Sequence, residues 1–203
     1  DKPAVRLVGP RGRYRFTRPQ RMSAVGRPAS QPTVAAAGGD VVVAWRQAPE
    51  DSPAEGQSGP IMAATRPPTG IISPAQTVDA TAAGFRPTVR ITTQGEAILV
   101  WSRSVGDVAQ LLASARPIGG SFGAPAIVAP SAGSGRLVVD NDGNAAVGYL
   151  TAGGFAARLR PSDGSFGAPM SLPGAGDSLF ISAGRTFTAA WVDEAVRFSD
   201  LTF

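Results

Sequence analysis

The sequence predicts an all-β protein, a β-propeller built from four-stranded antiparallel blades. Three observations favour this fold. A glycine–phenylalanine–proline phrase recurs along the chain, an aromatic residue ends an apolar run in the same phase, and no segment has a helical period. Four short strands in roughly 40–50 residues, repeated around an axis, are typical of a propeller blade. A chain of 203 residues is long enough for one such domain with a largely buried core.

The recurring phrase marks the turn before the outer strand of each repeat. It reads "GGSFGAP" at 119–125 and "DGSFGAP" at 163–169. Its aromatic residue is Phe16, Phe122 or Phe166 in three of the repeats, and we expect it to cover the edge of the core between blades. The glycines permit the positive φ of a tight hairpin. Proline suits an outermost strand because it has no N–H to donate to a ladder.

The second marker ends the second strand of each repeat. The runs "DVVVAW" and "EAILVW" are apolar without alternation, which is typical of strands that are covered on both faces. The aromatic residues at this position are Trp45, Trp101, Tyr149 and Trp191. We expect them to fill the space between neighbouring sheets.

One repeat shows all four strands in order. The second repeat has its expected strands at 87–93, 96–101, 110–117 and 122–130. Gln94-Gly95 and the "IGGS" segment at 118–121 supply two of its turns. The same order of strands and turns applies to the other repeats.

Counting the repeats predicts a single propeller domain over residues 1–203 with four blades. Three repeats are complete, and the fourth is composite; they span 27–80, 81–130, 131–173, and 174–203 together with 1–26. We therefore expect the N- and C-terminal strands to pair and close the ring. A leftover strand at 195–203 leaves two alternatives open, a part of a longer propeller or half of a dimeric one.

The units resemble those of GC-rich actinobacterial repeat proteins, whose repeats are of the "AVVAW…ARPxGGSFGAP" type. The segments "VVDNDGNAAVGY" and "ARPIGGSFGAP" carry this resemblance, which covers nearly the whole chain. It implies a secreted or surface-attached β-propeller, and so an extracellular or cell-surface location more than an activity. The chain opens at Asp1 without a signal peptide, so we expect a processed form or a fragment.

The composition excludes several kinds of site. The chain has no cysteine and no histidine, so disulfides, the common zinc sites and Ser-His-Asp or Cys-His centres are impossible. The "DNDGN" segment at 140–144 fails the spacing of a calcium loop and favours a hairpin turn. We therefore expect no metal and no cofactor. No apolar run is long enough to span a bilayer, so we expect no membrane insertion.

The charge distribution gives one argument for a nucleic-acid partner and one against it. The net charge is +4, and arginines are concentrated in the first thirty residues. A basic stripe is typical of phosphate binding. However, Arg11, Arg13 and Arg15 alternate along the chain, as one solvated face of an outer strand would. We expect that face to pair with the acidic C-terminal part and no nucleic acid to bind.

Loops that follow the second and fourth strands of a blade emerge on one face, where propellers usually bind partners. The first repeat carries its longest insertion there, at 46–60. The candidate binding residues on this face, with one on an inner strand, are Arg46, Glu50, Asp51, Arg86, Arg103 and, on the inner strand, Arg90. The expected function is a non-catalytic extracellular binding or scaffold module, not an enzyme. It would engage a protein or a surface glycan, as a monomer or a homodimer.

Two alternatives remain. A sialidase-like, glycan-active propeller would use a tyrosine nucleophile, a carboxylate and an arginine cluster. The chain lacks the Asp-box pattern, although "GFRPTV" at 84–89 is a faint match to an arginine motif. A pocket with clustered arginines and a buried carboxylate would favour this enzyme. The other alternative is a structural segment of a larger propeller assembly, which the strand at 195–203 supports.

Overall fold

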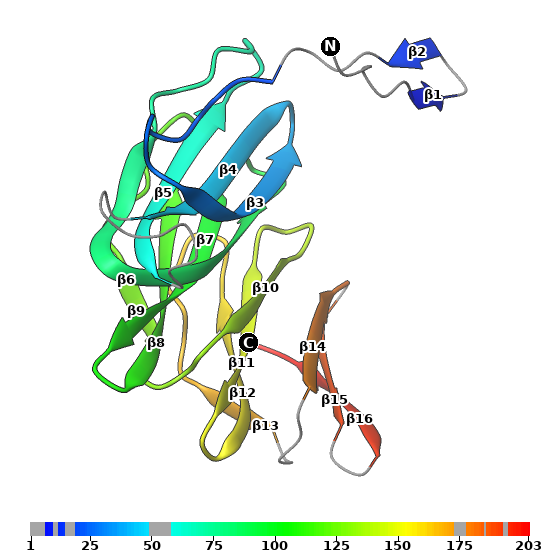
Figure 1. The fold of residues 1–203 in the computed structure, drawn as a ribbon. Helices are drawn as coiled ribbons and strands as arrows, with labels where there is room; N and C mark the ends of the chain where they lie inside the picture. The colour runs from blue at the N-terminus through cyan, green and yellow to red at the C-terminus, as the bar shows by residue number, and fades with distance from the viewer. Residues whose placement is uncertain are drawn as a thin grey trace.

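The computed structural model describes residues 7–9, 12–14, 19–48, 58–172, 178–184, 186–192 and 195–203. These residues form sixteen antiparallel strands and no helix, which confirms the all-β class (Figure 1). Within them there is accordingly no helix that is long and apolar enough to cross a membrane.

The first two repeats form one curled sheet of seven strands. In order, these are β3 (Ala29–Ala37), β4 (Asp40–Gln47), β5 (Gly59–Arg66), β6 (Gln76–Ile91), β7 (Ala97–Val105), β8 (Val108–Arg116) and β9 (Ala126–Ala129). The long strand β6 belongs to both repeats, because its first part pairs with β5 and its second part with β7. We call β3, β4, β5 and the start of β6 the first blade, and the rest of this sheet the second blade.

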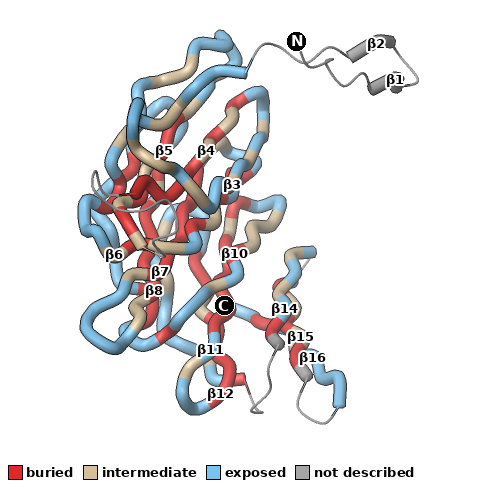
Figure 2. Tube along the Cα trace, in the orientation of Figure 1, coloured by how far each residue is buried: buried red, intermediate tan, exposed pale blue. Residues whose placement is uncertain are grey.

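The third and fourth blades are separate sheets. The third contains β10 (Gly135–Val139), β11 (Ala145–Thr151), β12 (Gly154–Arg160) and β13 (Met170–Leu172). The fourth contains β14 (Ser178–Ala183), β15 (Phe187–Val192) and β16 (Val196–Leu201). The sheets follow one another through space in chain order, and the buried residues concentrate along their middle strands (Figure 2).

Three apolar cores lie between successive blades, and the aromatic markers occupy them in turn. Trp101 lies in the first core, Tyr149 in the second and Trp191 in the third, and each is at most 4% exposed. Trp45, on β4, is also buried. Phe122 joins the first core and Phe166 packs against the second. Phe16 lies outside the described residues.

The expected ring closure is wrong for the part of the chain that the structure describes. Strands β1 (Leu7–Gly9) and β2 (Gly12–Tyr14) pair with each other, and Figure 1 shows this hairpin well away from the fourth blade. The reason lies in β16, whose six residues all pair with β15. Both edges of β15 are then occupied, by β14 and β16, so it offers no edge to an N-terminal strand. The result is a set of curled antiparallel sheets without a closed four-bladed ring.

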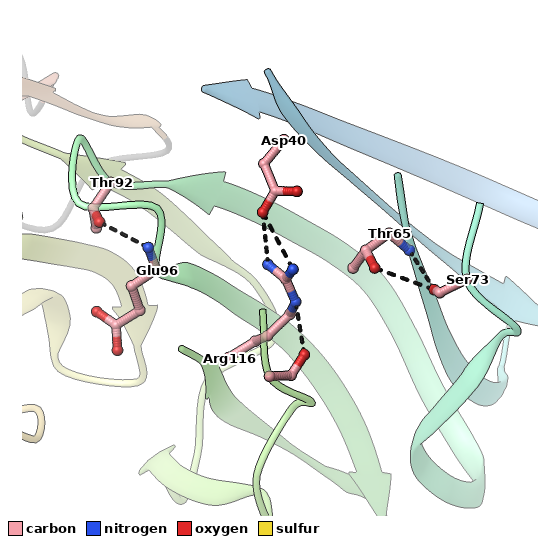
Figure 3. A network of polar contacts seen from close by, with 7 residues as sticks. Asp40, Thr65, Ser73, Thr92, Glu96 and Arg116 are labelled. Atoms are coloured by element: carbon pink, nitrogen blue, oxygen red, sulfur yellow. Dashed lines mark hydrogen bonds and ion pairs between the residues drawn. The ribbon is translucent and has the colours of Figure 1, made fainter. Parts of the chain in front are cut away.

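Polar contacts fasten the blades at one end. We call this the hairpin end, because it carries the turns between the first and second strands of each blade; the opposite end is the loop end. Arg116 of the second blade donates from Nη1 and Nη2 to Oδ2 of Asp40 in the first, at 3.3 and 3.2 Å (Figure 3). Arg160 of the third blade makes a two-pronged contact with Glu96 of the second, at 2.8 and 2.7 Å. Both pairs are largely buried.

Candidate functional site

The candidate site lies at the loop end of the first two blades, where a polar row crosses the sheet. Arg46 on β4 is directly opposite Ile61 on β5, and Ile61 is opposite Asp79 on β6. Residues that face each other across antiparallel strands project from the same side of the sheet. The side chains of Arg46 and Asp79 therefore flank Ile61, and they are only 2% and 4% exposed.

Asp79 is a fully engaged buried carboxylate. Its Oδ2 accepts the indole N–H of Trp101 at 2.8 Å. Its Oδ1 accepts both the backbone N–H and the hydroxyl of Thr81, at 3.0 and 2.8 Å. Burying a carboxylate is costly unless such partners compensate it. These donors fix Asp79 between the two blades.

Asp79 also holds an arginine of the second blade. Arg103 Nη1 lies 3.9 Å from Oδ2 of Asp79, and Nη2 donates to the side-chain oxygen of Gln110 at 3.1 Å. The Nε atom of Arg103 is buried and has no hydrogen-bond partner among the described residues. A buried N–H without an acceptor is rare, because nearly all buried polar groups in folded proteins are hydrogen-bonded.

Arg46 is an internal fastening residue rather than an exposed contact. Its Nε donates to the hydroxyl of Ser30 at 2.7 Å, and its Nη1 donates to the backbone carbonyl of Ser58 at 3.0 Å. Ser30 belongs to the first strand of the blade and Ser58 directly precedes β5. Arg46 thus ties the base of the 46–60 loop to the sheet.

Two residues of the inner strands have a backbone conformation that side chains rarely adopt. Gln31 and Arg86 have φ values of 53° and 52°, and no other non-glycine described residue has a positive φ. Each precedes a proline and lies at a β-bulge. The residue before proline normally prefers extended backbone, so both positions are strained. Strain of this kind concentrates at binding and catalytic sites.

The two strained residues contact each other. The side-chain oxygen of Gln31 accepts the backbone N–H of Arg86 at 2.6 Å, which joins the first strands of two successive blades. The Arg86 side chain is exposed, and its guanidinium lies 5.9 Å from the centre of the Phe85 ring. The contact therefore fixes the backbone and leaves the charged group at the surface.

A pair of glycines allows β6 to pass from one blade to the next beside the polar row. Gly84 is opposite Gly59 on one side and Arg103 on the other. A Cβ atom at Gly84 would lie 2.7 Å from Ile61 Cγ1 and 2.8 Å from the carbonyl oxygen of Gly59. Close approach of the two strands thus requires glycine, and it brings Arg103 to the same end of the molecule as Arg46 and Arg86.

Of the other predicted site residues, the structure describes only Arg90, and places it away from the polar row. Arg90 lies on the same strand as Arg86 but nearer the hairpin end, where its Nη1 donates to the carbonyl of Val89 at 2.9 Å. Glu50 and Asp51 lie outside the described residues. Within the described ranges, no group of three acidic residues is placed to hold a metal ion.

Sequence reasoning missed two members of the site, Asp79 and Gln31. An aspartate inside the strand segment "QTVDA" at 76–80 was one available signal, because aspartate is depleted in strands. The other was the parallel between "SQPTV" at 30–34 and "FRPTV" at 85–89, which gives Gln31 and Arg86 the same place in successive repeats.

No protein-family model matches the sequence, and a search of curated proteins finds no match either. Solved structures do resemble the fold. One comes from work on the GH130 family of mannoside phosphorylases. That family contains glycoside hydrolases that target β-1,2 mannosidic linkages in Candida mannan. This structure has 10% identity over 81% of this chain and 60% of that chain, with a TM-score of 0.52. Another is a family 117 glycoside hydrolase produced by the marine bacterium Zobellia galactanivorans, with 14% identity over 98% and 74% of the two chains and a TM-score of 0.51.

A glycosyl hydrolase from Bacteroides ovatus has a TM-score of 0.50, with 10% identity over 81% of this chain and 60% of that one. The present chain thus spans about three fifths of the GH130 and Bacteroides ovatus structures. At this level of identity the likeness shows the all-β fold of curled antiparallel sheets. The expectations of a non-catalytic scaffold and of a protein that is not an enzyme are contradicted, because these structures are glycoside hydrolases.

Proposed function

We propose that this chain is part of a glycan-active enzyme of the propeller glycoside hydrolase type, with its substrate-binding surface at the loop end of the first two blades. The observation that carries the proposal is the buried carboxylate of Asp79 at the loop end, with Arg103 Nη1 3.9 Å from its Oδ2 and Arg46 across Ile61 on the same side of the sheet. Arg86 lies two residues beyond Gly84, the partner of Arg103 across the strands. Clustered arginines beside a buried carboxylate are the feature that the sequence assigned to the glycan-active alternative. The likeness to glycoside hydrolases supports the same class.

The chemistry of these groups favours an anionic glycan. A guanidinium binds carboxylate or sulfate oxygens through two parallel N–H donors, and it stays charged at every physiological pH. Arg86 presents its guanidinium at the surface, and Arg103 has a buried N–H without a partner among the described residues. Both are donors without acceptor capacity, so an acidic sugar suits them better than a neutral one.

In this proposal Asp79 positions Arg103 and takes no part in the chemical step. Its side chain is 3% exposed and its oxygens already accept three hydrogen bonds, so it has no room to exchange a proton with a sugar. Glycoside hydrolysis generally uses two carboxyl groups. Glu50 and Asp51, which follow β4 in the sequence, are the first carboxylates to substitute in a search for an acid or a base.

The test is a hydrolysis assay with matched fluorogenic glycosides. We expect release of the fluorophore from a glycoside of an acidic sugar, such as a sialoside or a glucuronide, above release from mannosides, arabinofuranosides and xylosides. Arg86→Ala should lower kcat/KM for the acidic substrate by about tenfold to a hundredfold, the loss expected for one charged hydrogen-bonding partner.

Arg90→Ala is the matched control, because Arg90 is an exposed arginine of the same strand whose side chain donates to the carbonyl of its neighbour Val89. Equal activity of the two variants would remove Arg86 from substrate binding. No turnover of any glycoside by the folded protein would overturn the proposed function. The extracellular or cell-surface location stays a prediction that rests on the resemblance of the repeats.

A further inference from the structure

The two ion pairs at the hairpin end follow one rule of position. Arg66, Arg116 and Arg160 occupy the same place in the third strand of their blades, because each is paired with the first apolar residue of the second strand. The acids Asp40 and Glu96 directly precede that residue in the first and second blades. Arg116 and Arg160 therefore each receive their acid from the preceding blade.

The junction between the third and fourth blades lacks both the acid and the arginine. Asn144 stands in the third blade where Asp40 and Glu96 stand in the first two. In the fourth blade, Leu201 is paired with Phe187 and so occupies the place of the arginine. The acid and the arginine are thus present together or absent together.

Arg66 is the exception, since it has the arginine without the acid. It is exposed, and its side chain makes no hydrogen bond or ion pair with any other described residue. It lies on the side of the first blade that looks away from the second, which we call the outer face. The larger apolar residues of this face are Val34, Val41, Val43, Trp45 and Met62.

The outer face is incompletely covered. Val34 is 62% exposed, whereas Val89, its counterpart in the second blade, is 0% exposed. Trp45 and Met62 also line a hollow of about 510 Å³ together with Met22. The second and third blades would also present an apolar face beside an unpaired arginine if the blade before each of them were removed.

We propose that the outer face of the first blade binds a further β-blade of the same repeat type, one whose second strand is preceded by Asp or Glu. The carboxylate would pair with Arg66 as Asp40 pairs with Arg116. The fourth blade does not meet this description, because Thr186 precedes its second strand. Neither the fourth blade of the same chain nor that of a second copy therefore supplies the carboxylate at that position.

The first experiment asks whether the fourth blade is the occupant. Thr186→Glu gives this blade the missing carboxylate in the full chain. We expect neither the melting temperature nor the mass in solution to change in a way that depends on Arg66. A rise in melting temperature that Arg66→Met abolishes would assign the face to the fourth blade of the same chain. A dimer of the parent chain that Arg66→Glu dissociates would assign it to a second copy; either result overturns the proposal.

The second experiment supplies the proposed occupant. A copy of residues 81–130 is inserted between Val25 and Gly26 in the full chain, which places a blade with its own Glu96 ahead of the first blade. Repeat proteins gain stability by such additions, because each unit packs only on its neighbours. We expect a higher melting temperature and burial of the outer face. Arg66→Met should then lower the melting temperature by about 2–4 °C in the inserted chain and not in the parent.

The inserted Glu96 provides the matched control. Its change to Gln should produce the same loss as Arg66→Met, and the two changes together should cost little more than either alone, because they break one interaction. Arg66→Met with the same effect in both chains would overturn the proposal. An inserted chain that melts no higher than the parent would do so as well.

Discussion

Replacing Asp79 with Asn tests whether this buried carboxylate fastens the first two blades. The substitution keeps size and shape but turns one oxygen into an NH₂ group. Asp79 accepts from Thr81 through Oδ1 and from the indole of Trp101 through Oδ2. An asparagine keeps an acceptor for only one of these partners, so the other faces a second donor at about 2.8–3.0 Å.

The expected cost follows from these contacts. A buried donor left without an acceptor costs about 1–3 kcal/mol. The contact with Arg103 adds little, since its 3.9 Å separation and partial exposure make it a weak ion pair, worth about 0–1 kcal/mol. Together these give about 1–4 kcal/mol out of a typical total of about 5–15 kcal/mol. At about 2–4 °C for each kcal/mol, the melting temperature should fall by several degrees.

Equilibrium unfolding in urea, followed by tryptophan fluorescence and by circular dichroism, measures this loss. The control is the same substitution in a Trp101→Phe background, where no indole N–H needs an acceptor. There Asp79→Asn should cost at least about 1 kcal/mol less than in the parent, which is the coupling expected of residues in direct contact. A cost below about 0.5 kcal/mol in the parent, or the same cost in both backgrounds, would refute the assignment of Asp79 as the fastening residue.

Three further predictions concern the same blades. Arg116→Leu should destabilise the protein by about 3–5 kcal/mol in thermal unfolding, because it leaves Asp40 buried without a counter-charge, and Asp40→Asn in that variant should recover part of the loss. Gly84→Ala should cost about 1–3 kcal/mol, since its Cβ would press on Ile61, and a melting temperature equal to that of the parent would contradict the close approach. Arg86→Gly should raise stability by about 1 kcal/mol by removing backbone strain, while it lowers hydrolysis of acidic glycosides; a loss of both would indicate that Arg86 is only structural.

The repeat architecture was predictable because it depends on patterns of residues that are close together in the sequence. Strands that are covered on both faces must be apolar along their whole length, and the run "AILVW" at 97–101 meets this requirement at every position. An aromatic at the end of such a strand is then committed to the core, as Trp101 is at 0% exposure. These features depend on residues within one repeat, where sequence separation is short.

Ring closure was not predictable in this way. It depends on which edge the last strand selects, and periodicity is the same for every edge. The segment 196–201 alternates like a third strand, and β15 offered it a neighbouring edge after a short turn. Local pairing costs less chain entropy than pairing with residues at the other end of the sequence. Pairing of β16 with β15 is therefore favoured over pairing of β15 with an N-terminal strand.

The site was predictable only in part, for a related reason. The sequence identified Arg46, Arg86 and Arg103 by their place after or before strands, and the loop end does carry them. The sequence alone does not indicate that Arg46 is buried, because the hydrogen-bond partners of Arg46, Ser30 and Ser58, are 16 and 12 residues away. Burial of a charged side chain is decided by such distant partners and not by its own neighbours in the chain.

The two ends of the blade interfaces differ in charge, and this difference argues for a ligand. At the hairpin end, Arg116 and Arg160 are each matched by one buried carboxylate, which is what stability alone requires. At the loop end, Arg103 has a distant contact with Asp79, and Arg86 has no ion pair among the described residues. Arg86 also carries a strained backbone that glycine would relieve. Strain and unmatched positive charge both oppose folding, so their concentration at one end supports the proposed binding of an acidic glycan there.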